Sequence, residues 1–185
     1  MPMKSYVALL RGINVSGQNS IRMPALQDSM SRLGLRDIQT YLQSGNIIFR
    51  ADPSSEATLA ASIKARIAQD FGHEVPVLVL TAAGLELIAN SNPLWPKTGG
   101  AETLFHCTVL FQPVAPDTFQ ALTLPAAAGE RAVLVGRAVL LHCPQGYGKT
   151  KLNNSYFERA LGVPATTRNW RTVLALQGKL GSDSN

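Results

Sequence analysis

Short extended hydrophobic runs and helically spaced hydrophobic residues follow one another in an order that occurs twice along the chain. Residues 6–10 form an apolar run typical of a buried strand. Apolar residues between positions 23 and 33 recur every three or four residues, as in an amphipathic helix. The same reasoning predicts, for the first half, a strand over 6–10, a helix over 23–33, a hairpin of 38–43 and 47–50, a helix over 53–71 and a strand over 76–80.

The second half repeats this order of elements. The pattern predicts a strand over 104–111, a helix over 116–122, a hairpin of 131–135 and 138–143, a helix over 151–161 and a strand over 164–167. Each half is followed by a further predicted helix, over 82–90 and 169–179. We therefore expect an α+β fold of two ferredoxin-like βαββαβ repeats with antiparallel sheets, each repeat followed by an extra helix.

Matching residues support a duplication. Phe-Gly at 71–72 precedes Val-Pro at 75–76, Leu-Gly at 161–162 precedes Val-Pro at 163–164, and the hairpin turns contain Gly45 and Gly136. Residues 90–100 are rich in Pro, Gly and Asn, which is typical of a linker. We predict a first subdomain over 1–90, a linker over 91–103 and a second subdomain, with a C-terminal helix, over 104–185.

Composition narrows the class of protein. Apolar residues make up 45% and charged residues 16% of the 185 positions, which excludes a disordered chain. The net charge is +5, and six basic residues against two acidic ones from Leu141 onward favour anionic partners. Two cysteines cannot make a disulfide framework. No apolar run suits a signal peptide or membrane span, so we expect a cytoplasmic protein with no membrane partner. The oligomeric state stays open.

The loop after the first strand is a candidate anion site. Gly12 and Gly17 permit tight turns, and backbone amides beside Arg11 and Arg22 can cradle an anion. Arg and Asn side chains of the same loop can instead bind backbone carbonyls, so both roles stay open. The Ser-Gly-Asn sequence at 44–46 is explained more simply as a hairpin turn.

Residues 146–150, Gly-Tyr-Gly-Lys-Thr, resemble the end of a phosphate-binding loop. That pattern requires a glycine where this chain has Cys143, and the preceding strand is predicted to lie in an antiparallel hairpin. We therefore do not expect a nucleotide hydrolase. Lys149, Thr150 and Lys151 at the start of a predicted helix can still bind phosphate through amides and charge. A glycine turn with solvated lysines is the alternative.

The dipeptides His106-Cys107 and His142-Cys143 lie on strands predicted to be neighbours, which raises the question of a zinc site. Adjacent strand residues point to opposite faces of a sheet, so each dipeptide divides its ligands. We expect buried core cysteines instead, and we predict no metal and no cofactor. None of the histidines is recognisably paired with a nucleophilic Ser or Cys and with a carboxylate that would orient the ring, so the sequence does not indicate nucleophilic catalysis.

The run Thr-Thr-Arg-Asn-Trp at 166–170 is not required by packing alone. Arg168 offers a planar fork of donors, Asn169 an amide and Trp170 a large rigid face that we expect to pack rather than to stack on a base. The first half has no counterpart after residue 81. The run therefore serves either a ligand site or the junction between the repeats.

Five motifs occur in order along the chain: LLRGINV at 9–15, TYLQSGNIIF at 40–49, NP at 92–93, GKTKL at 148–152, and ATTRNW at 165–170, with Thr172, Val173 and Leu176 after it. Together they closely resemble the domain-of-unknown-function 1697 family of bacterial proteins, from residue 6 to about 180. The resemblance implies a fold of ferredoxin-like repeats and no established activity. The family usually has Gly-Gly-Lys-Asn where this chain has Ser-Gly-Gln-Asn at 16–19, which weakens a phosphate role for that loop, although Arg22 is a candidate substitute.

These observations predict a binding protein whose ligand is anionic, either a phosphate-bearing metabolite or nucleic acid, held in a basic cleft between the repeats. The alternatives are an enzyme acting on a phosphorylated or carboxylated small molecule, and a structural module with no small-molecule site. The predicted ligand-binding residues, all polar or basic and all in loops, turns or at helix starts, are Arg11, Asn14, Asn19, Ser44, Asn46, Lys149, Lys151, Arg168 and Asn169.

Overall fold

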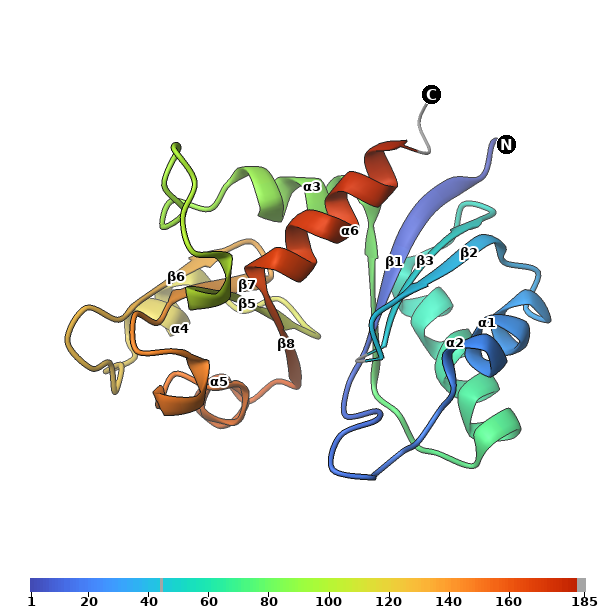
Figure 1. Ribbon diagram of the computed structural model, residues 1–185, viewed down its shortest axis with the longest axis horizontal. Helices are drawn as coiled ribbons and strands as arrows, with labels where there is room; N and C mark the ends of the chain where they lie inside the picture. The colour runs from blue at the N-terminus through green and yellow to red at the C-terminus, as the bar shows by residue number, and fades with distance from the viewer. Residues whose placement is uncertain (44, 183–185) are drawn as a thin grey trace. The chain divides into compact units, whose positions relative to one another are not determined.

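The computed structural model describes residues 1–43 and 45–182, and the chain forms two compact units. The first unit comprises Met1–Glu86 with Leu176–Asn185, and the second comprises Leu87–Ala175. Each unit contains one four-stranded antiparallel sheet with its own helices (Figure 1). The predicted α+β class and the two similar repeats are confirmed, whereas the expected subdomain boundaries stay a prediction.

The most apolar strand of the first repeat is one of the two central strands of its sheet. Its elements are β1 (Lys4–Leu10), α1 (Met23–Ser31), β2 (Arg36–Tyr41), β3 (Asn46–Ala51), α2 (Glu56–Phe71) and β4 (Val77–Thr81), followed by α3 (Ala82–Asn90). The strand order is β2-β3-β1-β4. Residues 6–10 of β1 are all buried, so neither face of this strand is exposed to water.

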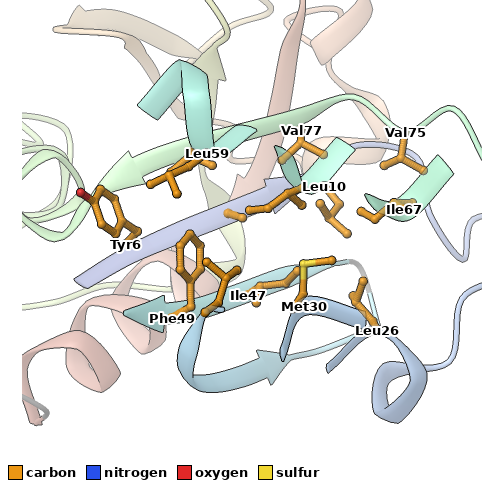
Figure 2. Close-up of a cluster of buried hydrophobic side chains, with 14 of the residues drawn as sticks. Tyr6, Leu10, Leu26, Met30, Ile47, Phe49, Leu59, Ile67, Val75 and Val77 are labelled. Carbon is orange, nitrogen blue, oxygen red and sulfur yellow. The ribbon is translucent and has the colours of Figure 1, made fainter. Parts of the chain in front are cut away.

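The helices α1 and α2 cover one face of the first sheet. Tyr6 and Leu10, which lie on the same face of β1, share a core with Met30 of α1 and Ile67 of α2 (Figure 2). Alternation along the strand and three- or four-residue spacing along the helices bring these apolar side chains together. The helix α2 begins where the Ser55 hydroxyl accepts a hydrogen bond from the N–H of Thr58, which is a typical N-cap.

The second repeat has the same order of strands and helices. Its elements are a 3-10 turn at Glu102–Leu104, β5 (Phe105–Leu110), α4 (Pro116–Gln120), β6 (Arg131–Val135), β7 (Ala138–His142), a 3-10 turn at Tyr147–Lys149, α5 (Asn154–Leu161) and β8 (Ala165–Asn169), followed by α6 (Trp170–Ser182). The strand order β6-β7-β5-β8 corresponds to β2-β3-β1-β4. The helices α2 and α5 both end at a left-handed glycine, Gly72 and Gly162, each with φ near 70°.

Several predicted helix ends differ from the structure, among them the start of α2 at Glu56 and the end of α4 at Gln120, and two further ones have a clear local reason. The helix predicted over 151–161 begins only at Asn154, because the Asn153 side chain accepts a hydrogen bond from the N–H of Tyr156 and caps the helix there. The helix predicted over 23–33 ends at Ser31, and Arg32 is its C-cap residue. Gly34, two residues further along, adopts a left-handed conformation with φ 77°. Lys149 and Lys151 therefore precede α5 and do not belong to its first turn.

Burial of the two cysteines is confirmed, since Cys107 and Cys143 are both free thiols in the interior of the second unit. Among residues 1–43 and 45–182, no three His, Cys, Asp or Glu side chains gather in a way that could hold a metal ion. Within that same part of the chain, no helix combines the length and apolar character needed to cross a bilayer.

Candidate functional site

In the first unit, Asn14 holds the loop that follows β1. Its backbone is left-handed, with φ 53°, a conformation that Asn tolerates better than most residues. The amide donates hydrogen bonds to the carbonyls of Ile21 (3.0 Å) and Gln43 (2.8 Å), and its oxygen accepts one from the N–H of Ile21 (2.8 Å). Both N–H groups of this side chain thus bind the protein's own backbone, which gives Asn14 a structural role.

The other predicted asparagines of the first unit also bind backbone carbonyls. Asn19 donates to the carbonyl of Gly12 at 3.1 Å and so closes the same loop. Asn46, which is fully buried at the start of β3, donates to the carbonyl of Tyr41 at 2.7 Å across the hairpin. These contacts show what the three amides do in the fold, and direct contact with a ligand stays a prediction for each.

The end of β1 and the start of β3 bring the predicted residues of the first unit together. Leu9 of β1 lies opposite Asn46 in the sheet register. Arg11 is the first residue after β1 and is half-buried. Its backbone N–H donates to the carbonyl of Pro76 at 3.0 Å. Ser44, also predicted to bind a ligand, lies outside the described residues. Arg11, Asn14, Asn19 and Asn46 are therefore grouped at one end of the first sheet.

In the second unit, Arg168 is a buried cation. Only 9% of the residue is exposed, and its Nη1 donates to the Thr166 hydroxyl (2.8 Å) and to the Thr167 carbonyl (3.0 Å). Burial lowers the pKa of Arg168 to about 10, and burial raises the pKa of Cys107, its neighbour across the sheet, to about 12. At neutral pH the guanidinium is therefore charged and the Cys107 thiol is protonated.

Arg168 and Asn169 do not act on one surface, although they are adjacent in the sequence. Consecutive residues of a strand point to opposite faces of the sheet, and both belong to β8. The Asn169 side-chain oxygen accepts a hydrogen bond from the N–H of Thr172 at 2.9 Å, which makes Asn169 the N-cap of α6. Trp170 is fully buried and packs against Trp95, with ring centroids 6.3 Å apart, as expected of a packing residue.

A column of paired polar residues, which the sequence did not identify as a site, runs along β5 and β8. The pair Leu110 and Ala165 belongs to the core, Thr108 lies opposite Thr167, and His106 lies opposite Asn169. The signal for it was polar residues at alternate positions of two strands, 106 and 108 in one and 167 and 169 in the other. Opposite residues of antiparallel strands share a face, so the column becomes more polar toward the start of β5.

The column is held by a chain of hydrogen bonds. Thr108 and Thr167 hydroxyls are 2.8 Å apart, and the Thr167 hydroxyl donates to the Asn154 side-chain oxygen at 2.9 Å. The N–H of Asn154 donates to the Tyr147 hydroxyl at 2.9 Å, and the Tyr147 ring stacks on His106 with centroids 4.5 Å apart. We call His106, Thr108, Tyr147, Asn154, Thr167 and Asn169 the polar column.

A hollow of about 460 Å³ lies beside the N-terminal end of α5. Two of the side chains that line it are cationic and exposed, Lys151 before the helix and Arg159 within it. We call this the basic hollow; the residues that line it are Pro125, Thr150, Lys151, Asn153, Ser155, Tyr156 and Arg159. Of the nine predicted binding residues, Lys151 lies in this lining. Lys149 is exposed but outside it.

Comparison with known proteins identifies relatives of the same fold. The family model described as "Protein of unknown function (DUF1697)" matches residues 3–140. The solved structure of the conserved bacterial protein SP0830 from Streptococcus pneumoniae is similar, with 24% sequence identity and a TM-score of 0.73, covering 97% of this chain and 99% of that one. At that identity the likeness concerns the fold. No curated protein shows significant sequence similarity to the chain.

Proposed function

The chain belongs to the DUF1697 family of proteins of unknown function, and we propose a function from its own side chains: the second unit binds a phosphate-bearing anion in the basic hollow. The observation that supports this most is the pairing of Lys151 and Arg159 in one concave surface whose described lining contains no acidic residue. Without a carboxylate neighbour, two exposed cations attract an anion rather than an internal partner.

The neutral residues of the hollow suit the same ligand. Ser155 brings an exposed hydroxyl to the lining, and hydroxyls donate to phosphate oxygens, whereas the Tyr156 hydroxyl donates to the Thr123 carbonyl at 3.4 Å and Thr150 is buried. The first N–H groups of α5 contribute less than the sequence suggested. The N–H of Asn154 already donates to the Tyr147 hydroxyl, and the N–H of Tyr156 donates to Asn153. Side-chain charge is therefore the main source of affinity in this proposal.

The size of the hollow bears on the class of ligand. A volume of about 460 Å³ lies within the range of small-molecule sites, roughly 300 to 1,000 Å³, and exceeds what a bare phosphate fills. A phosphorylated metabolite and a short stretch of nucleic acid offer the same phosphate chemistry. They differ in salt dependence, because a strand that contacts several phosphates releases several counterions.

Binding to the hollow is tested by a double substitution of its cations. We expect Lys151→Ala with Arg159→Ala to weaken binding of AMP, followed by calorimetry, by at least tenfold, since a hydrogen bond to a charged group contributes about 1.5–3 kcal/mol. A labelled oligothymidylate, followed by fluorescence anisotropy at two salt concentrations, reports on nucleic acid. There the double variant should reduce the slope of log affinity against log salt by about one for each phosphate that the two cations neutralise.

The matched control removes the same charge elsewhere in the second unit. Lys97→Ala with Arg131→Ala replaces two exposed cations that do not line the hollow. Tight binding of AMP alone favours a metabolite, and steeply salt-dependent binding of the oligonucleotide favours nucleic acid. If the control variant loses as much affinity as the hollow variant, net charge explains the binding and the site is wrong. If neither probe binds, the proposed function is wrong.

A further inference from the structure

The strand β6 forms one edge of the second sheet, and its outer side pairs with no strand in the described part of the chain. A two-residue turn joins Val135 to Ala138, so these two residues form a hydrogen-bonded pair and bonded pairs alternate with non-bonded pairs from there. The backbone groups of Val133 therefore bind β7. Those of Ala132 and Leu134 point away from β7, to the side where a further strand would lie.

A hollow of about 340 Å³ lies beside this edge. Every side chain in its described lining is apolar except that of Gln120 in α4. Ala132 and Leu134 line it from β6, and their side chains also pack against the core of the second unit. We call it the apolar hollow; its other side is formed by Val114, Pro116 and Phe119. The two residues with outward backbone groups thus border a space that suits apolar side chains.

The equivalent edge of the first sheet is protected against further pairing. The register of β2 with β3 shifts between Arg36 and Gln39, and Asp37 between them has a left-handed backbone with φ 50°. Bulges and charges of this kind keep a sheet edge from pairing with another chain. The register of β6 with β7 is regular over the whole strand, and Arg131 at its start is its only charged residue. The strand β6 therefore keeps the geometry that a further strand requires.

The extent of this surface indicates an extended segment as its partner rather than a folded protein. The five residues of β6, at about 3.4 Å each, give an edge about 17 Å long. With the apolar hollow the surface comprises about ten residues, whereas a stable interface between folded proteins takes roughly 20–30 residues from each partner. Addition of a strand to a sheet edge needs only free backbone groups and pockets for alternate side chains.

We propose that β6 binds an extended peptide segment of another protein as a fifth, antiparallel strand. Every strand pair of this sheet is antiparallel, and antiparallel pairing is slightly the more stable kind. Two peptide residues separated by one exchange both backbone hydrogen bonds, the first with Leu134 and the second with Ala132. Opposite residues share a face, so these two peptide side chains enter the apolar hollow and are apolar. The site shares no residue with the basic hollow, so either site can fail without the other.

Arg131 adds a preference for charge. It is exposed at the start of β6 and forms no ion pair or side-chain hydrogen bond with residues 1–43 or 45–182. In an antiparallel peptide, the residue opposite Arg131 comes directly after the second apolar residue. An acidic side chain there forms a cross-strand pair of opposite charges. The recognised peptide sequence is therefore apolar, any residue, apolar, acidic.

The experiment titrates the ¹⁵N-labelled full chain with the acetylated and amidated peptide Lys-Thr-Leu-Thr-Val-Glu-Thr-Lys, whose Leu, Val and Glu follow this pattern. The peptide is added to about 2 mM, because so small a surface gives a Kd near the millimolar range. We expect the amide signals of Ala132 and Leu134 to move downfield as their N–H groups gain acceptors. Those of Val133 and Val135, which already bind β7, should move less, and those of β2 should stay in place.

Two N-methylated peptides test the backbone contacts. Methylation at the Leu removes an N–H that donates to the carbonyl of Leu134, and it should weaken binding by about tenfold. Methylation at the Thr between Leu and Val changes an N–H that points away from β6, and it should leave Kd within about twofold. The two peptides have the same mass and composition, so any difference between them reports on the side of the strand that binds.

A change of charge on both partners tests the role of Arg131. Replacing the Glu of the peptide by Lys should weaken binding by about two- to fivefold, and Arg131→Glu in the chain should reverse the preference while Tm changes little. The proposal is overturned if the signals of Ala132 and Leu134 do not move, if the two methylated peptides bind alike, or if Arg131→Glu leaves the preference unchanged. It is also overturned if the same signals move when the chain is concentrated without peptide, since β6 then pairs with a second copy.

Discussion

Gly45 shows how much of this fold depends on single residues. Its φ is 85°, a left-handed conformation that side chains rarely adopt. A Cβ added there would lie 2.7 Å from Cδ1 of Ile13 and 2.8 Å from Cβ of Leu10, closer than such atoms approach. We predict that Gly45→Ala lowers the free energy of unfolding by about 2–4 kcal/mol, the sum of backbone strain and overpacking. The midpoint and slope of urea unfolding measure it.

The second repeat supplies the control for this substitution. Gly136 occupies the matching hairpin turn with φ 57°, and a Cβ there would meet no atom within 4 Å. Gly136→Ala should therefore cost only the backbone strain, about 1–2 kcal/mol. Equal losses at the two glycines would show that packing under Gly45 contributes nothing.

Single residues also mark where sequence reasoning stops. Gly45 and Gly136 were predicted correctly as turn glycines, because local backbone conformation follows from local sequence. The close approach of Ile13 to Gly45 was not predictable, since it depends on a loop some thirty residues away folding against the hairpin. His106 was considered only as half of a metal pair, because its lack of a partner depends on which strand lies opposite it.

At the scale of elements, one side chain holds the loop between β1 and α1. Asn14→Asp keeps the oxygen that accepts from Ile21 but places a carboxylate against the carbonyls of Ile21 and Gln43, where the amide had donated. We predict a loss of about 1–3 kcal/mol in the free energy of unfolding, because two partners lose their donors. Thermal unfolding followed by circular dichroism measures the change.

Asn19→Asp is the matched control within the same loop. Asn19 donates one hydrogen bond, to the carbonyl of Gly12 at 3.1 Å, and that bond is exposed to solvent, so water can replace the donor. The control should lose less than about 1 kcal/mol. If the two variants lose the same stability, Asn14 does not hold the loop more than its neighbour does.

Elements differed in how well the sequence predicted them. The helix α3 was predicted over 82–90 and lies at Ala82–Asn90, and β6 was predicted over 131–135 and lies at Arg131–Val135. The start of α5 was predicted three residues early, because Lys151 and Leu152 suit a helix but the Asn153 side chain accepts a hydrogen bond from the N–H of Tyr156 and caps the helix at Asn154. The basic hollow was not predicted, since Pro125 and Arg159 reach it only through the fold.

At the scale of the whole molecule, each repeat has a hydrophobic core of its own. In the first unit, Ile63 of α2 is fully buried in the cluster that includes Tyr6 and Phe49. In the second unit, Phe157 of α5 is fully buried in the cluster that includes Leu110 and Leu141. The duplicated pattern of hydrophobic positions predicted both cores, because alternation in strands and helical spacing recur in the same order. The charge excess after Leu141 did not by itself locate a binding surface.

Two separate cores imply that a cavity made in one of them is felt mainly in the same unit. We predict that Ile63→Ala lowers the hydrogen-exchange protection of amides in β1 and β3, and that Phe157→Ala lowers it in β5 and β7, by free energies of about 2–5 kcal/mol. Peptide-resolved exchange followed by mass spectrometry measures both variants against the unsubstituted chain. Amides of the unsubstituted unit should keep most of their protection in each variant. An equal loss over β1, β3, β5 and β7 in both variants would mean that the chain opens as one cooperative unit, and the two repeats would then be a duplication of pattern without a duplication of stability.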